Sequence, residues 1–189
     1  MKKHQVLTRS LTLLLGIFVS VLFVSEAAAA PLHQSCPGFP MDVSTEGELN
    51  NAIACFNALG GGNVTINVTA DITLSGNTTQ MNNSSATASL RIEGQNHTID
   101  GDSKGRIFDI QAGRLTIHNL TIQNGVTDAN GNGGGMYIGS GANVLAINFN
   151  VLNSSATGEG GGVYNAGTFG LTGDIAYNMA GPYGRCPTA

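Results

Sequence analysis

Two stretches decide the fold: R-L-T-I-H-N-L-T-I-Q at 114–123 and N-V-L-A-I-N-F-N-V-L at 143–152. In each, apolar residues stand at offsets 0, 2, 5 and 7 from the second residue, so Leu115 in the first corresponds to Val144 in the second. Between and after them, G-G-G-M-Y at 133–137 recurs as G-G-G-V-Y at 160–164. A sequence period of about 20 to 50 residues without helical periodicity predicts a β-solenoid.

The offsets also predict where each coil bends. Steps of two residues keep side chains on one face of a strand, whereas the three-residue step from Ile117 to Leu120 indicates a corner. Asn adopts the left-handed conformation that such a corner needs. We expect Asn119 and Asn148 in corresponding corners, one residue apart in register.

Alternating apolar residues predict further strands outside these two copies. They stand at Val64, Ile66, Val68, Ile72, Leu74, Leu90 and Ile92, and a weaker third copy runs through Phe169, Leu171, Ile175 and Tyr177. A single coil cannot bury its inward side chains, so stacked coils must share one core. The sequence predicts an all-β chain that forms a right-handed parallel β-helix, a solenoid, over 45–180.

One helix is expected, at 45–58, where it would cap the N-terminal end. Thr45 and Glu48 form a capping box. Apolar residues follow at helical spacing, at Leu49, Ala52, Ile53 and Phe56, and three glycines at 60–62 end the helix.

Residues 1–29 have the pattern of a signal peptide. A positively charged start is followed by an apolar run at 11–24, which is short for a membrane span, and then by small residues. We expect cleavage after Ala29, with an uncleaved membrane anchor as the alternative. The rest would begin with a loop at 30–44 and be secreted, or be held at the cell surface or outer membrane.

Removing that segment leaves five basic residues against eleven acidic ones, a net charge of −6. Nucleic acids and anionic membranes both require a basic surface, so neither is expected as a partner. No second long apolar stretch follows, and we expect a soluble product after cleavage.

Three cysteines stand at 36, 55 and 186. Export leads to an oxidising environment, and Cys36 and Cys55 flank one short segment, so we expect a disulfide between them. Cys186 is then left as a free thiol, or its partner lies in sequence that this chain lacks.

The repeats resemble the polymorphic outer-membrane protein repeat of bacteria, above all in N-S-S-A-T-G-E-G-G-G-V-Y at 153–164. The stretch I-E-G-Q-N-H-T-I-D-G at 92–101 is similar to the first coil of pectin-lyase-like β-helix proteins, and the helix to their cap. The resemblance covers about 45–178. It implies the fold, and the fold is shared by adhesins, lyases and hydrolases. Residues 181–189 depart from the repeat, and we expect an irregular tail on a truncated chain.

The densest acidic cluster is Asp100, Asp102 and Asp109. It could supply a general acid and base or a Ca²⁺ site, but Asp100-Gly101 is also a tight-turn dipeptide. We favour the turn. The segment Asp128-Ala-Asn-Gly-Asn-Gly matches the opening of an EF-hand loop, yet its twelfth position is Gly139 instead of Glu. We therefore expect no cofactor, with calcium as the alternative.

Histidines and tyrosines offer weaker signals. His97 and His118 each stand beside an Asn and have no catalytic partner at a telling spacing. Tyr137 and Tyr164 align in successive copies, which predicts an aromatic ladder that packs or, less expectedly, binds sugars.

Two functions are compatible with the sequence. The first is a non-catalytic adhesin that displays a β-helix to a surface glycan, or to a host or matrix protein. The second is the N-terminal part of a pectin-lyase-like carbohydrate-active enzyme, a polysaccharide lyase or glycoside hydrolase. An enzyme would gather Asp, Lys, Arg or His on neighbouring coils of one face, whereas an adhesin would scatter them.

Overall fold

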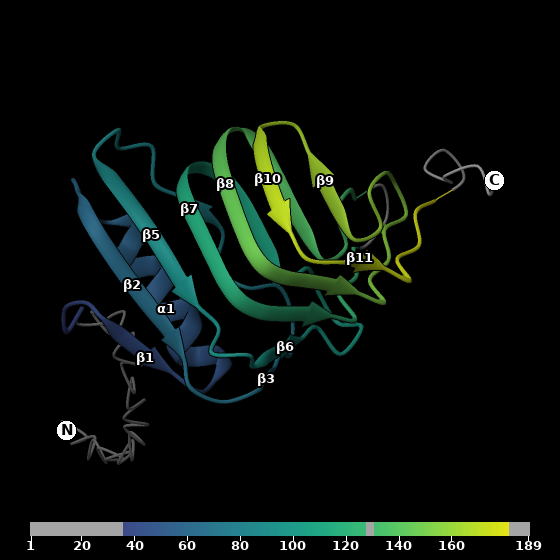
Figure 1. Ribbon diagram of the computed structural model, residues 1–189, viewed down its shortest axis with the longest axis horizontal. Helices are drawn as coiled ribbons and strands as arrows, with labels where there is room; N and C mark the ends of the chain where they lie inside the picture. The colour runs from purple at the N-terminus through teal and green to yellow at the C-terminus, as the bar shows by residue number, and fades with distance from the viewer. Residues whose placement is uncertain (1–35, 128–130, 182–189) are drawn as a thin grey trace, which may run out of the picture. The chain divides into compact units, whose positions relative to one another are not determined.

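The computed structural model describes residues 36–127 and 131–181 (Figure 1). Its strands run parallel in successive coils, which confirms the predicted parallel β-helix. The expected signal peptide, Cys186 and residues 182–189 of the expected tail lie outside the described residues.

Eleven strands and one helix make up the described residues. The strands are β1 (Met41–Val43), β2 (Gly62–Val68), β3 (Ile72–Thr73), β4 (Met81–Asn82), β5 (Ala88–Glu93), β6 (Thr98–Asp100), β7 (Phe108–Gln123), β8 (Met136–Leu152), β9 (Val163–Asn165), β10 (Thr168–Thr172) and β11 (Ile175–Ala176). The helix is α1 (Glu46–Asn57).

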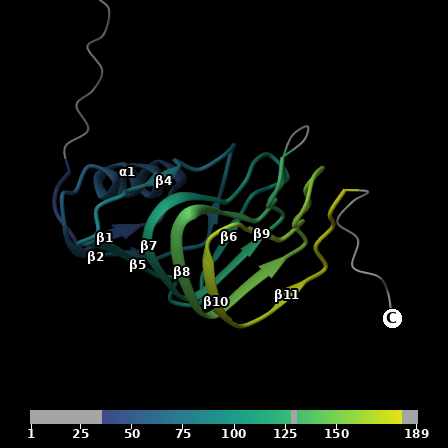
Figure 2. The same ribbon diagram turned by 90° about the horizontal axis from the view of Figure 1, so that it is seen from above.

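The pairing of these strands defines three faces. Face 1 contains β1, β2, β5, 114–118 of β7, 143–147 of β8, and β10. Face 2 contains β3, β6, 120–123 of β7, 149–152 of β8, and β11. Face 3 contains β4, 108–110 of β7, 136–138 of β8, and β9. The long strands β7 and β8 bend through all three faces (Figure 2).

The core consists of columns of apolar side chains, one rung for each coil. Leu115 lies opposite Val144, and Ile117 lies opposite Ala146. All four are at most 3% exposed. The same-offset pairs of the two deciding stretches are therefore stacked neighbours, as the sequence predicts.

The two corner asparagines lie in the same register, which corrects the expected offset of one residue. His118 pairs with Ile147, and Leu120 pairs with Phe149, so Asn119 faces Asn148. Both adopt a positive φ, 52° and 50°. Consecutive coils bend at the same point because any offset would bring an inward column out of line.

The Gly-Gly-Gly segments lie where the backbones of neighbouring coils approach closely. A β-carbon at Gly134 would collide with the carbonyl oxygen of Ser155, and one at Gly161 with that of Met179. Glycine is needed there because any side chain would push the coils apart.

Helix α1 packs against the N-terminal coils, which confirms the predicted helix. Thr45 accepts a hydrogen bond from the Glu48 amide at 3.3 Å, while the Glu48 carboxylate accepts one from the Ser44 amide at 2.8 Å. The inner side of the helix consists of the buried side chains of Leu49, Ala52, Ile53, Cys55 and Phe56.

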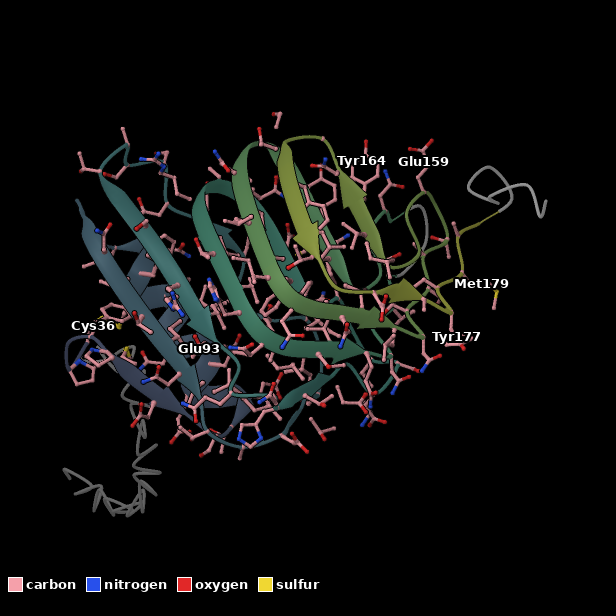
Figure 3. All side chains as sticks on the ribbon, viewed as in Figure 1. Cys36, Glu93, Glu159, Tyr164, Tyr177 and Met179 are labelled. Carbon is pink, nitrogen blue, oxygen red and sulfur yellow. A yellow bond between two sulfur atoms is a disulfide. The ribbon has the colours of Figure 1, made fainter. Side chains whose placement is uncertain are left out.

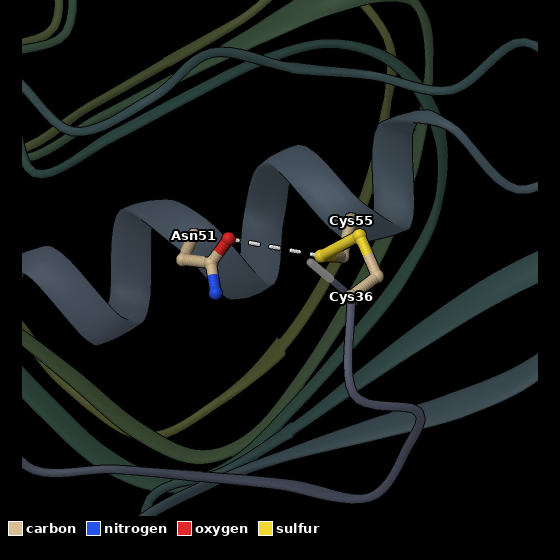
Figure 4. Close-up of a disulfide and its surroundings, with 3 residues drawn as sticks. All are labelled: Cys36, Asn51 and Cys55. Carbon is tan, nitrogen blue, oxygen red and sulfur yellow. Dashed lines mark hydrogen bonds between the residues drawn. A yellow bond between two sulfur atoms is a disulfide. The ribbon is translucent and has the colours of Figure 1, made fainter. Parts of the chain in front are cut away.

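Strand β1 lies inside the stretch expected to be a loop. Met41 and Val43 point inward at 8% and 0% exposure, and Met41 pairs with Ile66 of β2. Just ahead of β1, Cys36 is joined to Cys55 of α1 by a disulfide, with 5.6 Å between the Cα atoms (Figure 4).

The third copy is less buried than the other two. Phe169 and Leu171 pair with Val144 and Ala146 as predicted. Ile175 pairs with Val151, so this coil has a corner one residue shorter. Three large apolar side chains are exposed here, and Figure 3 labels the last two: Ile175, Tyr177 and Met179.

Among the described residues, α1 is the sole helix, and no membrane-spanning helix is found.

Candidate functional site

Asp100 ends β6 on face 2, and its carboxylate is held by the next coil. Gln123 donates to it at 2.8 Å and Asn124 at 3.0 Å, while the Asp102 amide donates at 2.8 Å. Partial burial raises the pKa of Asp100, but these hydrogen bonds outweigh burial and hold the pKa below its ordinary value of 3.8. The carboxylate stays ionised and stabilises the turn after β6.

The other two acids have separate partners. Asp102 forms an ion pair with Lys104 at 2.6 Å, and both side chains are more than half exposed. This contact raises the pKa of Lys104. Asp109 lies on face 3, where Gln111 donates to it at 2.7 Å. The structure thus links Asp100 to Asp102 through a turn but directs Asp109 to other groups.

Arg106 organises the start of face 3. Its guanidinium contacts Asp109 at 3.1 Å, the Gly133 carbonyl at 3.0 Å and the Asn132 carbonyl at 2.8 Å. The Arg106 side chain is only 19% exposed. It ties β7 to the loop before β8. No sequence signal marks this cluster, because two of its partners are backbone carbonyls that lie far away along the chain.

A column of outward side chains follows face 3. Gln80 donates to Asp109 at 3.1 Å, Asp109 lies opposite Tyr137, and Tyr137 lies opposite Tyr164. The two rings stack with centroids 5.2 Å apart, and the Arg106 guanidinium lies 5.2 Å from the Tyr137 ring centre. The tyrosine ladder therefore packs along the stack, where one ring face covers the next.

Neither histidine meets a nucleophile in the described residues. His97 Nδ1 lies 3.2 Å from Asp71, which also accepts a hydrogen bond from the Thr98 amide at 2.8 Å. The Thr98 and His97 contacts lower the pKa of Asp71. His118 lies on face 1, beside Glu93 on the neighbouring strand. These contacts join coils and assemble no proton-transfer site.

No metal-binding group of His, Cys, Asp and Glu side chains occurs in the described part of the chain. In the loop resembling an EF-hand, the Asn132 side chain accepts a hydrogen bond from the Glu159 amide at 2.7 Å. Asp128 and Asn130 lie outside the described residues.

Face 1 carries a surface hollow of about 410 Å³, which crosses β2, β5, β7 and β8. It is lined by Asn63, Thr87, Ala88, Ser89, Arg114, Leu115, Thr116, Asn143 and Leu145. Among these, Arg114 is the one charged residue. The sequence did contain a signal for this surface, because alternation with inward Leu115 and Ile117 turns Arg114 and Thr116 outward.

The stacked coils and capping helix define a β-helix protein of the pectin-lyase-like type. Residues 41–161 match the family described as "Putative pectate lyase-like adhesive domain". The match spans more than half of the chain, so the chain belongs to this family, and the predicted resemblance to pectin-lyase-like β-helices is confirmed. Searches of curated proteins and of solved structures returned no match.

Proposed function

We propose that this chain is a non-catalytic adhesion protein that is secreted or held at the cell surface or outer membrane. Membership of a family described as adhesive is the observation that carries the proposal. The β-helix then serves as a rigid support, and its outward side chains contact a surface glycan or a host or matrix protein.

The contacts of the three acidic residues Asp100, Asp102 and Asp109 support a structural role for them. A glycosidase needs two carboxylates that face one sugar-sized groove. Here Asp100 accepts hydrogen bonds from the neighbouring coil, Asp102 pairs with exposed Lys104, and Asp109 binds Arg106. Asp100 and Asp102 share the turn after β6, whereas Asp109 lies on face 3, and each carboxylate is engaged by groups of the chain itself.

Adhesion is tested by coating beads with the purified chain and measuring their retention, under flow, on cells and on immobilised matrix. Beads coated with an unrelated acidic protein provide the control. We expect retention above that control, and equal retention of the two kinds of bead would contradict adhesion.

The enzymatic alternative is tested on the same preparation. Pectin and polygalacturonate are incubated with the chain, with and without Ca²⁺, and new reducing ends and unsaturated products are measured. We expect no turnover. Turnover that is abolished by Asp100→Ala or Asp102→Ala, but retained by the exposed-acid control Glu159→Ala, would replace adhesion with polysaccharide cleavage as the function.

A further inference from the structure

The outward-facing positions of face 1 form a regular grid. One row consists of Asn63, Ser89, Arg114, Asn143 and Thr168, and the next of Thr65, Arg91, Thr116, Leu145 and Gly170. Adjacent strands lie about 4.8 Å apart. Residues on neighbouring rungs can therefore contact one small ligand together, and the hollow lies over the middle of this grid.

Arg114 differs from the other basic residues of the described chain. Arg91 pairs with Glu93 at 2.6 Å, Lys104 with Asp102, and Arg106 with Asp109. Arg114 is exposed, and its guanidinium has no hydrogen-bond or ion-pair partner within residues 36–127 and 131–181. A planar guanidinium without a partner is suited to bidentate binding of a carboxylate or sulfate.

The charge around the hollow favours an anion. No acidic residue is among its described lining residues, although acids outnumber basic residues in the whole chain, 12 to 8. The closest acid by register, Glu93, lies one row beyond Arg91 and is bound by Arg91 and by Asn119 at 2.7 Å. The hollow is therefore a positively charged site on the surface of an acidic protein.

The remaining lining residues suit a sugar ring. The side chains of Thr116 and Asn143 make no hydrogen bond within the described residues, so both can bond to hydroxyl groups. Leu145 offers an apolar surface that is 46% exposed. At the N-terminal side, Ser89 donates to Asn63 at 2.6 Å, so this pair is already satisfied.

We propose that this hollow binds an anionic sugar unit of a glycan. The carboxylate or sulfate of the sugar binds Arg114, its hydroxyls bind Asn143 and Thr116, and its apolar ring face packs on Leu145. This inference rests on the proposed adhesive function and specifies its ligand.

The test is titration calorimetry of the purified chain at low salt with three probes. Hyaluronan oligosaccharide carries carboxylates only, dextran sulfate carries sulfates only, and plain dextran is neutral. We expect binding of one or both anionic probes, no binding of dextran, and weaker binding at higher salt. The two anionic probes tell which group is recognised.

Variants locate the site. Arg114→Gln should weaken binding at least about tenfold, as expected for loss of a charge-assisted hydrogen bond. Arg114→Lys should fall between Arg114→Gln and the unchanged chain. The matched control Lys104→Gln removes one exposed positive charge from another part of the surface and should bind as the unchanged chain does. Thermal unfolding should be the same for all of them.

Three outcomes would overturn the proposal: binding of neither anionic probe, equal binding of dextran, or equal losses in Arg114→Gln and Lys104→Gln. The bead-retention assay distinguishes a wrong ligand from a wrong adhesive function. If beads adhere but the anionic probes do not bind, the ligand is wrong and adhesion stands.

Discussion

Asn148 donates a hydrogen bond from its Nδ2 atom to Oδ1 of Asn119, 2.9 Å away in the coil before it. Asn119 in turn donates to Glu93 at 2.7 Å. The same corner of three successive coils is therefore linked by side chains, ending on a carboxylate. Burial raises the pKa of Glu93, but the hydrogen bonds from Asn119 and Arg91 outweigh burial and lower it. The ladder thus ends on a charged acceptor.

Two substitutions of Asn119 separate the contribution of its side-chain hydrogen bonds from that of its left-handed backbone conformation. Asn119→Gly removes the β-carbon, which suits the positive φ, but loses both side-chain hydrogen bonds, whereas Asn119→Ala loses the same bonds and keeps a β-carbon in the left-handed conformation. We expect the free energy of unfolding to fall in both variants, and by about 1 kcal/mol more in the alanine variant. Urea denaturation measures this order, and equal stabilities of the two variants would contradict the role of φ.

An acidic substitution in an inward column tests whether the side chains of that column are buried. Ile117 is 0% exposed, and Ile117→Asp would bury an unpaired carboxylate at a cost of about 4 kcal/mol or more. We expect that variant to lose its β-type circular dichroism spectrum. Thr116→Asp, one residue away on the outward side, should keep it. A folded Ile117→Asp variant would show that Ile117 does not point inward.

Stability should fall in acid, partly through Asp100. Its folded pKa lies below 3.8, so the stability that its ionised form contributes is fully present above that value. This contribution is lost as the pH falls through the lower folded pKa. Urea denaturation from neutral pH to about pH 2 measures the free energy of unfolding. The difference in this free energy between the unchanged chain and Asp100→Asn should become smaller below about pH 4. A difference in the free energy of unfolding that does not change with pH would exclude this contribution.

The disulfide should stabilise the N-terminal end. Cys36 and Cys55 are 19 residues apart, and closing a loop of that length contributes about 3 kcal/mol to the free energy of unfolding. A reducing agent should lower the urea midpoint of the unchanged chain. The double variant Cys36→Ser, Cys55→Ser should start at that lower midpoint and show no response to the reductant.

The fold could be predicted from the sequence because, in a solenoid, residues that are one repeat apart in the sequence lie next to each other in space. Residues one period apart, such as Leu115 and Val144, stack directly. Strand β1 was not foreseen, since three residues after a proline carry too short an alternation. Its position depends on the pairing of Met41 with Ile66, which lies beyond α1 in the sequence.

The candidate sites were less predictable than the fold. The three acids are close in the sequence, yet Asp109 belongs to a different face because a turn and a corner loop intervene before β7. Arg106 depends on backbone carbonyls, which have no sequence signal. Arg114 was visible as an outward residue, but its lack of a partner follows only from the whole arrangement of face 1.

The disulfide between Cys36 and Cys55 also determines how the chain responds to pulling. Tension that enters from the N-terminal side at Cys36 crosses the sulfur bridge directly to Cys55. Strand β1 lies inside the bridged loop and bears no load, so its pairing with β2 is not peeled apart. The first element of the β-helix to feel the force is instead the end of α1, whose Phe56 is buried in the core. A β-helix with this connection resists unravelling from its N-terminal end.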